Sequence, residues 1–502
     1  TEMETRHKCW LRLAGATMTI ALLLLGLNGK GMAQRVLTLQ DALDIAMQNS
    51  PDIRRSQLNL QRSRESLNAQ KAALKSQFSL SITPMDYRNE RIFNSFFSRW
   101  NTNETKTSYG TFTIWQPIKW TDGTLALINR FAWQDVYSEF QNARSKTFSN
   151  NLYLSFQQPI FTYNRTQIAL RRLELDLEDA ALSYAIRRLA LERSVVQSFF
   201  DVYRNKMSLE IAREEEKNQE LSYQIIKNKV DAGLSAMEEL YQAELNLASS
   251  KSNVQNKQVI LDNSLDAFKQ LIGQSLFEEI DIQGDITHQP VQIDLQAALD
   301  HGLKWRMELR QSQIDIETSM FDLIQASATN EFRGDVTISY GVIGTDERFA
   351  DIYQVPTKNQ RFSLSLEVPL WDWGEKKSRT KSAEAVVKTR ELSLEDERNS
   401  IIIAIRKVYR NLQNLEGQIE IARQNVRNAQ LTYDINLERY KNGDLTSMDL
   451  QLYQNQLSQK KLTLVDALIS YKIELLNMKI QSLWDFERNE SAVPTELLKL
   501  RS

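Results

Sequence analysis

Apolar residues near the end of the chain recur at the three- and four-residue spacing of an α-helix. The spacing continues from Ile401 to Tyr440 almost without a break, and a second apolar stripe runs from Leu450 to Met478. Two such stripes separated by a short polar segment are typical of two helices that pack along each other as a coiled coil. We therefore interpret these residues as packing positions and not as a cofactor site.

Proline and glycine show where these helices begin and end. Residues 160–289 and 370–493 contain no proline, and the only glycines near their midpoints that fit a tight turn are Gly233 and Gly443. These positions of proline and glycine predict two hairpins, each with a long helix, a turn and a return helix. The expected long helices are 163–231 and 374–441, and the return helices end near residues 272 and 483. At about 1.5 Å per residue, each long helix would reach roughly 100 Å.

Other segments alternate apolar and polar residues with the period of two that marks a β-strand. The clearest is 362–370, and similar patterns occupy 78–83, 112–118, 125–133, 152–157 and 336–342. The pattern alone fits either the sheet of a soluble protein with one solvent-exposed face or the strands of a membrane β-barrel. Six of the nine tryptophans lie in or beside these strands, which favours the membrane. The residues expected to face lipid are Phe362, Leu364, Leu366, Val368, Val336, Ile338, Tyr340, Leu152, Leu154 and Phe156, and the expected interface aromatics are Trp115, Trp371 and Trp373.

The chain is internally duplicated. Pro159-Ile160-Phe161 and Pro369-Leu370-Trp371 are 210 residues apart, as are the turn glycines Gly233 and Gly443. Upstream, Leu39–Asp44 matches Leu295–Asp300 at an offset of 256, so the first copy carries 46 more residues. This insertion contains an additional pair of strands, within 105–135.

The N-terminus has the pattern of a secretory signal. Basic residues precede an apolar run from Leu13 to Leu27, and Gly31-Met32-Ala33 fits a cleavage site, with Gln34 as the first mature residue. The alternative is an uncleaved anchor. The one cysteine, Cys9, precedes the apolar run, so a mature chain would contain no disulfide, catalytic thiol or cysteine-bound zinc.

Charge and composition exclude further functions. The chain has 62 Lys plus Arg against 64 Asp plus Glu, a formal charge of −2, which gives no electrostatic basis for binding nucleic acid. Beyond the signal, His288 and His301 are the only histidines, and we find no nucleophile elbow, phosphate-binding loop or dinucleotide glycines. We expect no catalytic residue, no cofactor and no metal site, so that a partner must supply energy for any transport.

The order of these features resembles the TolC family of outer-membrane efflux proteins. The residues that carry the resemblance are the repeat start Leu39–Leu43 with Asn49-Ser50-Pro51-Asp52, the strand exits Gln157–Phe161 and Glu367–Gly374, and the turns Val230–Leu234 and Tyr440–Asp444. The resemblance implies a mainly α fold with membrane-spanning β-strands. It also implies a homotrimer, whose coiled-coil hairpins form a periplasmic tunnel and whose strands form one shared transmembrane β-barrel. It implies an exit channel of a tripartite efflux or type I secretion system in the outer membrane of a Gram-negative bacterium, with a periplasmic adaptor and an inner-membrane pump as partners.

The family contributes four strands per protomer. If the extra hairpin joined the wall, this chain would contribute six; if it folded over the pore or outside it, the count would stay at four, which we favour.

The resemblance also assigns roles to the helix turns. It implies that the periplasmic tip, where the adaptor docks, consists of Gly233, Leu234, Ser235, Gly443, Asp444, Leu445 and Thr446, and that the pore gate consists of Glu239, Tyr440 and Asp449. Turn formation alone would also explain the tip residues, since Ser235 with Glu238 and Thr446 with Asp449 have the spacing of capping boxes. The family's gate arginine is replaced here by Leu445, so the usual lock between protomers is absent.

The expected organisation follows from the repeat. It comprises a signal peptide (1–33), first-repeat N-terminal helices (34–77), first-repeat strands with the extra hairpin (78–161), a helical hairpin (162–272), a linker (273–292), second-repeat N-terminal helices (293–331), a β-hairpin (332–372), the second helical hairpin (373–483) and a tail (484–502). Two other classes stay open: a periplasmic adaptor, which also carries a long helical hairpin, and a secreted coiled-coil scaffold.

Overall fold

The computed structural model describes residues 35–284 and 286–494, which form two compact units. The hairpin unit contains residues 35–55, Ile186–Gly302 and Ile403–Ala492. The sheet unit contains Ser56–Ala185, Leu303–Ile402 and residues 493–494. The predicted signal peptide, 1–33, lies outside the described residues.

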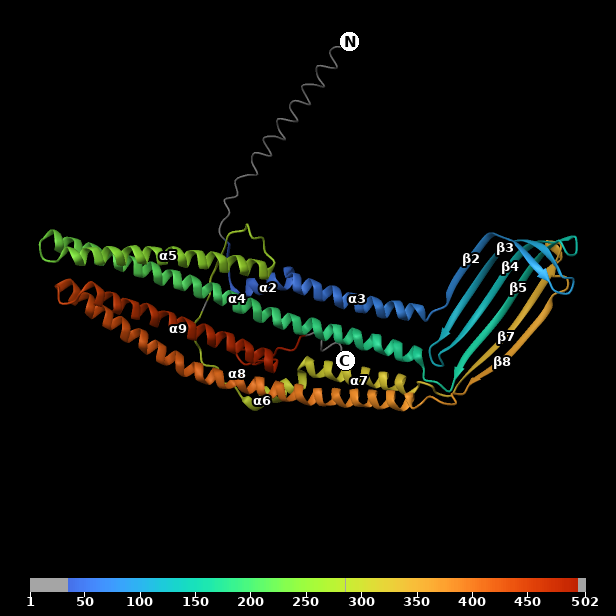
Figure 1. Cartoon of the computed structure of the whole chain (residues 1–502). Coiled ribbons are helices and arrows are strands. Elements are labelled where there is room, and N and C mark those ends of the chain that lie inside the picture. The colour runs from blue at the N-terminus through green and yellow to red at the C-terminus, as the bar shows by residue number, and fades with distance from the viewer. Residues whose placement is uncertain (1–34, 285, 495–502) are drawn as a thin grey trace, which may run out of the picture. The chain divides into compact units, whose positions relative to one another are not determined.

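Two long helical hairpins dominate the hairpin unit (Figure 1). The first consists of α4 (Arg165–Asp231) and α5 (Met237–Ile272), and the second of α8 (Glu375–Asn442) and α9 (Ser447–Ser482). The sequence prediction of two such hairpins is confirmed. α4 has 67 residues and α8 has 68, so each is about 100 Å long, and both continue into the sheet unit.

Short elements complete the hairpin unit. β1 (Arg35–Leu37) pairs in parallel with β6 (Ile280–Ile282), although the two are far apart in sequence. Lys206 of α4 binds this pair, because its Nζ lies 2.8 Å from Asp281 Oδ1 and donates to Ile282 O. The remaining elements here are α2 (Leu39–Asn49), β9 (Trp484–Asp485), β10 (Glu490–Ser491) and α6 (Leu295–Trp305), whose last residues belong to the sheet unit.

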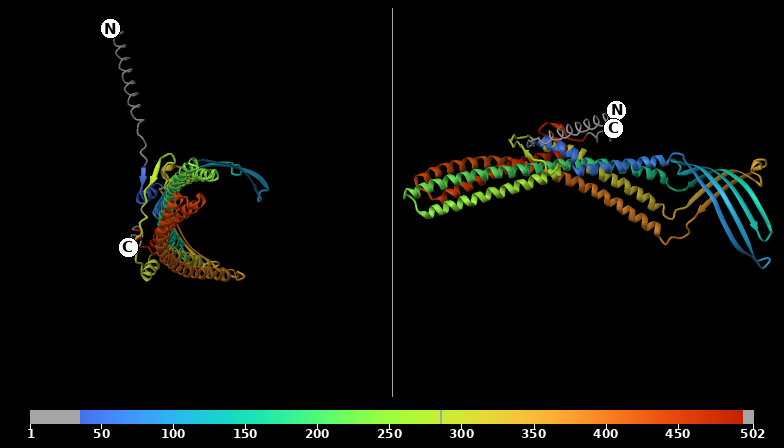
Figure 2. Two further views of the ribbon diagram at one scale, coloured as in Figure 1. Left: turned by 90° about the vertical axis from the view of Figure 1, so that its left-hand side faces the viewer. Right: turned by 90° about the horizontal axis from the view of Figure 1, so that it is seen from above.

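The sheet unit contains one antiparallel sheet of six strands in the order β2-β3-β4-β5-β7-β8. Figure 2 shows that this sheet is twisted and curved. Its strands are β2 (Gln77–Asn94), β3 (Arg99–Ile118), β4 (Gly123–Ser138), β5 (Ala143–Ile160), β7 (Arg333–Asp346) and β8 (Thr357–Glu367), with a short 3₁₀ helix, η1 (Phe349–Asp351), between the last two. α3 (Pro51–Ala73) and α7 (Met307–Ser327) lead into β2 and β7, while β5 and β8 lead into α4 and α8. All four helices therefore join the same end of the sheet (Figure 1).

The sheet of this chain contains six strands, two more than the four per protomer that we expected in the barrel. The additional hairpin, β3 and β4, is inserted between β2 and β5 and pairs with both. The strands are also longer than the apolar alternation predicted, since β2 continues to Asn94 and β3 begins at Arg99, in a segment without regular alternation. Hydrogen bonds between neighbouring strands hold that segment in the sheet, and such bonds do not depend on an apolar pattern.

In the part of the chain that the structure describes, no helix has both the length and the hydrophobicity needed to cross a membrane.

Candidate functional site

The two hairpin turns have the same backbone geometry. Gly233 and Gly443 adopt left-handed conformations, with φ of 74° and 91°. Leu234 N donates to Lys229 O at 2.8 Å, and Asp444 N donates to Arg439 O at 2.9 Å, which closes both helix ends in the same way. A residue with a Cβ is strained at such φ values, so glycine is needed at both positions.

Tyr440 lies at the contact between the two hairpins. Its side chain is only 1% exposed, and its hydroxyl donates to Ser222 O of α4 at 3.3 Å. Lys229 Nζ donates to Tyr440 O at 2.8 Å and lies 5.5 Å from the centre of the tyrosine ring. Lys229 and Tyr440 therefore join the end of α4 to the end of α8.

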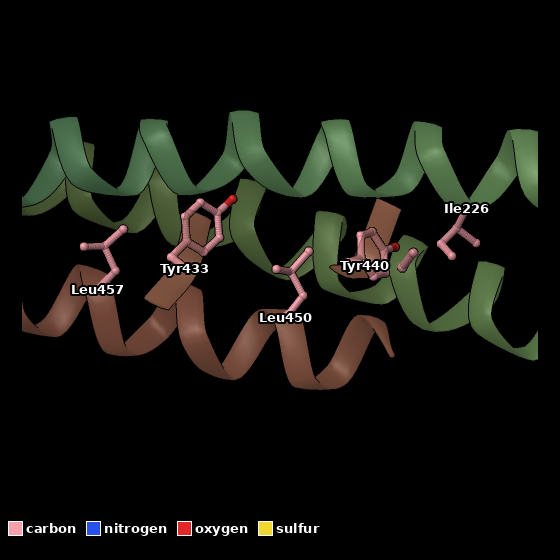
Figure 3. Packing of buried hydrophobic residues seen from close by; sticks show 6 residues of the cluster. Ile226, Tyr433, Tyr440, Leu450 and Leu457 are labelled. Carbon is pink, nitrogen blue, oxygen red and sulfur yellow. The ribbon is translucent and has the colours of Figure 1, made fainter. Parts of the chain in front are cut away.

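A buried apolar cluster surrounds this contact (Figure 3). It consists of Ile226, Ala243, Tyr433, Tyr440, Leu450 and Leu457, which come from all four long helices. Leu445, one of the predicted tip residues, packs against the cluster. Burial raises the pKa of Tyr433 to about 12, and burial together with the nearby Glu239 carboxylate raises the pKa of Tyr440. Both tyrosines are thus protonated at neutral pH, and the Tyr440 hydroxyl is a donor.

The two predicted acidic gate residues make local contacts. Asp449 N donates to Thr446 Oγ1 at 3.2 Å, so Thr446 is the N-cap of α9 and this half of the predicted capping box is confirmed. The predicted capping box of Ser235 with Glu238 is wrong, because Ala236 is the N-cap of α5. Ser235 Oγ instead donates to Glu239 Oε2 at 2.6 Å. Of the three gate candidates, Glu239 and Tyr440 lie close together, whereas Asp449 is an exposed residue of the α9 cap.

Sequence reasoning missed exposed apolar residues beside the turns. Leu234 is 79% exposed, and Met237, Tyr241 and Leu245 follow at four-residue intervals on one face of α5, each at least half exposed. On α9, Met448 and Leu452 form a shorter exposed pair with the same spacing. The four-residue spacing was visible in the sequence, but only the structure distinguishes these residues from those that pack inside the hairpins.

The strand register brings the predicted lipid-facing residues onto one face of the sheet. Leu154 is opposite Tyr340, Phe156 is opposite Ile338, and Ile338 is opposite Phe362. Phe362 is 70% exposed and Leu364 is 49% exposed, so the residues that the structure describes leave this apolar face open. Val336, Leu364, Leu366 and Leu152 belong to the same face, whereas Val368 lies one residue beyond the end of β8.

The opposite face carries mostly small polar residues. It includes Ser79, Ser81, Thr111, Thr113, Ser155, Ser339, Ser363 and Ser365. Trp115 alternates with Ile114 and therefore lies on this polar face. Trp371 and Trp373 follow β8, are 75% and 90% exposed, and contact each other edge to face at 5.6 Å.

The described residues include no group of three or more His, Cys, Asp and Glu side chains that could hold a metal ion. His301 Nδ1 lies 3.0 Å from Ser482 O, and the His288 ring packs against Tyr471 at 4.6 Å. The two histidines thus belong to separate structural contacts.

Comparison with known proteins agrees with this architecture. The model of the outer membrane efflux protein family matches residues 125–274 and 334–479, one segment in each repeat. No curated protein matches.

Several solved structures have the same fold at low sequence identity. The CmeC outer membrane channel of Campylobacter jejuni has a TM-score of 0.68 and 14% identity, covering 92% of this chain and 88% of CmeC. CusC has a TM-score of 0.65 and 15% identity, covering 91% and 94%, and VceC of Vibrio cholerae has 0.65 and 16%, covering 88% and 95%.

The family match sets aside the two alternatives left open by the sequence, a periplasmic adaptor and a secreted scaffold. It assigns the chain to the outer membrane, with efflux as its role. With its duplicated helical hairpins and its sheet with one apolar face, this chain belongs to the outer membrane efflux protein family.

Proposed function

We propose that this chain forms a passive exit channel as a homotrimer, which receives cargo from an inner-membrane pump through a periplasmic adaptor, in a tripartite efflux or type I secretion system. The observation that carries the proposal is that the described residues form an open six-stranded sheet with one apolar face and two unpaired edges. The energy for transport comes from the pump, and the channel itself catalyses no reaction.

The edge strands are suited to pairing between copies. β2 and β8 are the edge strands, and each has one neighbour in the sheet. Neighbouring strands run in opposite directions, so the first and the sixth strand of the sheet are also antiparallel to each other. β8 of one copy can therefore pair with β2 of the next in the antiparallel sense. Six strands are fewer than the roughly eight of the smallest membrane barrels, and an open edge in lipid leaves backbone groups without partners. Closure thus requires several copies in a ring, and three is the number that the family resemblance implies.

The two faces of the sheet match a membrane wall. The apolar face, with Phe362, Leu154 and Ile338, faces lipid, and the serine- and threonine-rich face lines the lumen. Trp371 and Trp373 lie at the helix-bearing end of the sheet, where an aromatic girdle contacts the membrane interface. Trp115 lies on the lumen side and is not part of that girdle.

The helix turns form the periplasmic tip. The proposed docking surface for the adaptor consists of Gly233, Leu234, Ser235, Gly443, Asp444, Leu445 and Thr446. The exposed stripe of Met237, Tyr241 and Leu245 beside it can bury its apolar side chains against a partner helix. In the gate, Tyr440 holds the two hairpins together, and Glu239 and Asp449 are the acidic residues next to the pore.

Single-particle imaging of the detergent-purified protein tests the assembly. We expect three-fold particles that contain a closed barrel and helical hairpins. A monomer with an open sheet would refute the proposal, because the sheet edges would then have no role in closure.

A further inference from the structure

We infer that the β3–β4 hairpin belongs to the membrane wall, so that three copies close a barrel of eighteen strands with a lumen wide enough for cargo about 20 Å across. The inference rests on the proposed function, because it needs the sheet to close between copies. It concerns the size of cargo that the outer-membrane segment admits.

The first support is the continuity of strand pairing. β3 pairs with β4 at every position from Asn103 opposite Ser138 to Ile118 opposite Gly123, and β4 pairs with β5 from Thr124 opposite Gln157 to Ser138 opposite Ala143. β4 has 16 residues, and a membrane-spanning strand needs only about 9–11. The hairpin is therefore long enough to cross the bilayer beside its neighbours.

The second support is that the apolar face continues across the hairpin. One row of paired residues runs across five strands: Phe78, Ile114, Leu127, Leu154 and Tyr340. A hairpin folded over the pore or outside the membrane would not need apolar residues in register with the lipid-facing residues of its neighbours.

The third support is that the turn between β3 and β4 is held at the helix-bearing end of the sheet. Asn164 Nδ2 donates to Lys119 O at 2.8 Å, Gln158 Nε2 donates to Thr121 O at 2.6 Å, and Thr166 N donates to Asp122 Oδ1 at 3.1 Å. These contacts bind the turn to the end of β5 and the start of α4, and they keep the hairpin from swinging away from the wall.

The strand count sets the width of the lumen. With neighbouring strands about 4.8 Å apart and tilted by roughly 40°, eighteen strands give a barrel about 36 Å across between backbones, against about 24 Å for twelve. Facing sheets pack about 10 Å apart, so side chains on the inner face take up roughly 10 Å of either diameter, which leaves about 26 Å and about 14 Å. The lumen face is rich in serine and threonine, whose side chains are small. The wider barrel would admit cargo about 20 Å across, which the narrower one would exclude.

A shortened variant supplies the matched comparison. Deleting residues 95–138 removes β3 and β4 and joins Asn94 to Glu139, while the turn 139–142 is kept. β2 then pairs with β5, with Asn94 opposite Ala143. In this register the apolar face of β2 continues the apolar face of β5. We expect single-particle images to show eighteen strands in the full chain and twelve in the variant. In planar bilayers, poly(ethylene glycol) added on the barrel side should enter the full channel at hydrodynamic diameters up to about 20 Å, and the variant only up to about 12 Å.

A pair of point variants tests the wall position without relying on the deletion. Leu127 is on the apolar face and Ile128 on the lumen face of β4. An arginine on the lipid face of a strand strongly disfavours membrane assembly. Leu127→Arg should therefore remove most of the assembled channel from the outer membrane, whereas Ile128→Arg should assemble at wild-type levels.

The outcomes separate this inference from the proposed function. Pores with twelve strands, or equal assembly of the Leu127→Arg and Ile128→Arg variants, would overturn the inference and leave the channel proposal intact. Failure of the full chain to form multimeric pores would overturn both.

Discussion

Replacing Lys229 with methionine tests whether the contact at the turns keeps the tip closed. The substitution preserves most of the length of the side chain and removes its charge. It thereby removes the hydrogen bond from Lys229 Nζ to Tyr440 O, at 2.8 Å, and the cation–π contact with the tyrosine ring at 5.5 Å.

The magnitude follows from these two contacts. A hydrogen bond to a charged group contributes about 1.5–3 kcal/mol when buried. Lys229 is half-buried, so solvent screening reduces this to about 1 kcal/mol. A cation–π contact at such a site adds about 0.5–1 kcal/mol. Together they favour the joined hairpins by about 2 kcal/mol, which corresponds to a roughly 10- to 30-fold change in the ratio of closed to open tips.

The assay is single-channel recording in planar bilayers, which reports the open probability directly. Lys227→Met is the matched control, because Lys227 is an exposed residue two positions earlier on the same helix. We expect the ratio of open to closed time to rise at least 10-fold for Lys229→Met and to stay at the wild-type value for Lys227→Met. Equal open probabilities in the two variants would show that the contact does not control the tip.

Four further variants test the hairpin unit. Tyr440→Ala should destabilise the hairpin unit by about 3–5 kcal/mol, because it leaves a cavity. Tyr440→Phe loses only the hydrogen bond to Ser222 O and should destabilise the unit by about 0.5–1 kcal/mol. Equal urea midpoints of unfolding for the two variants would contradict this. Thr446→Ala should cost about 1 kcal/mol, because it removes the cap that binds Asp449 N, and an unchanged thermal midpoint would argue against that role. Burial, followed by repulsion from a nearby arginine, lowers the pKa of His288 below its usual 6.5. The unfolded chain therefore binds this proton at higher pH than the folded chain, and stability falls as the pH drops through 6.5. The His288→Asn variant should lose less stability between pH 7 and pH 5 than the wild type. The same dependence of stability on pH in both proteins would show that His288 does not contribute to it.

The side-chain contacts at the hairpin turns were harder to predict from the sequence than the helices and strands themselves. Gly233 and Gly443 were found from the sequence because left-handed helix ends require a particular residue type. The contact of Lys229 with Tyr440 was not found, because it joins residues 211 positions apart through side chains whose directions depend on how the helices pack. For the same reason Glu239, and not Glu238, is the partner of Ser235.

The sequence alone determined the helical hairpins, their duplication and which residues of each strand share a face. These properties follow from local spacing, because a helix repeats every 3.6 residues and a strand every two. Only the tertiary structure decided that six strands form one sheet and that Tyr440 is enclosed between two hairpins. Strand neighbours are selected by backbone hydrogen bonds, which every residue except proline can make, so the side-chain pattern of a strand does not identify its partner.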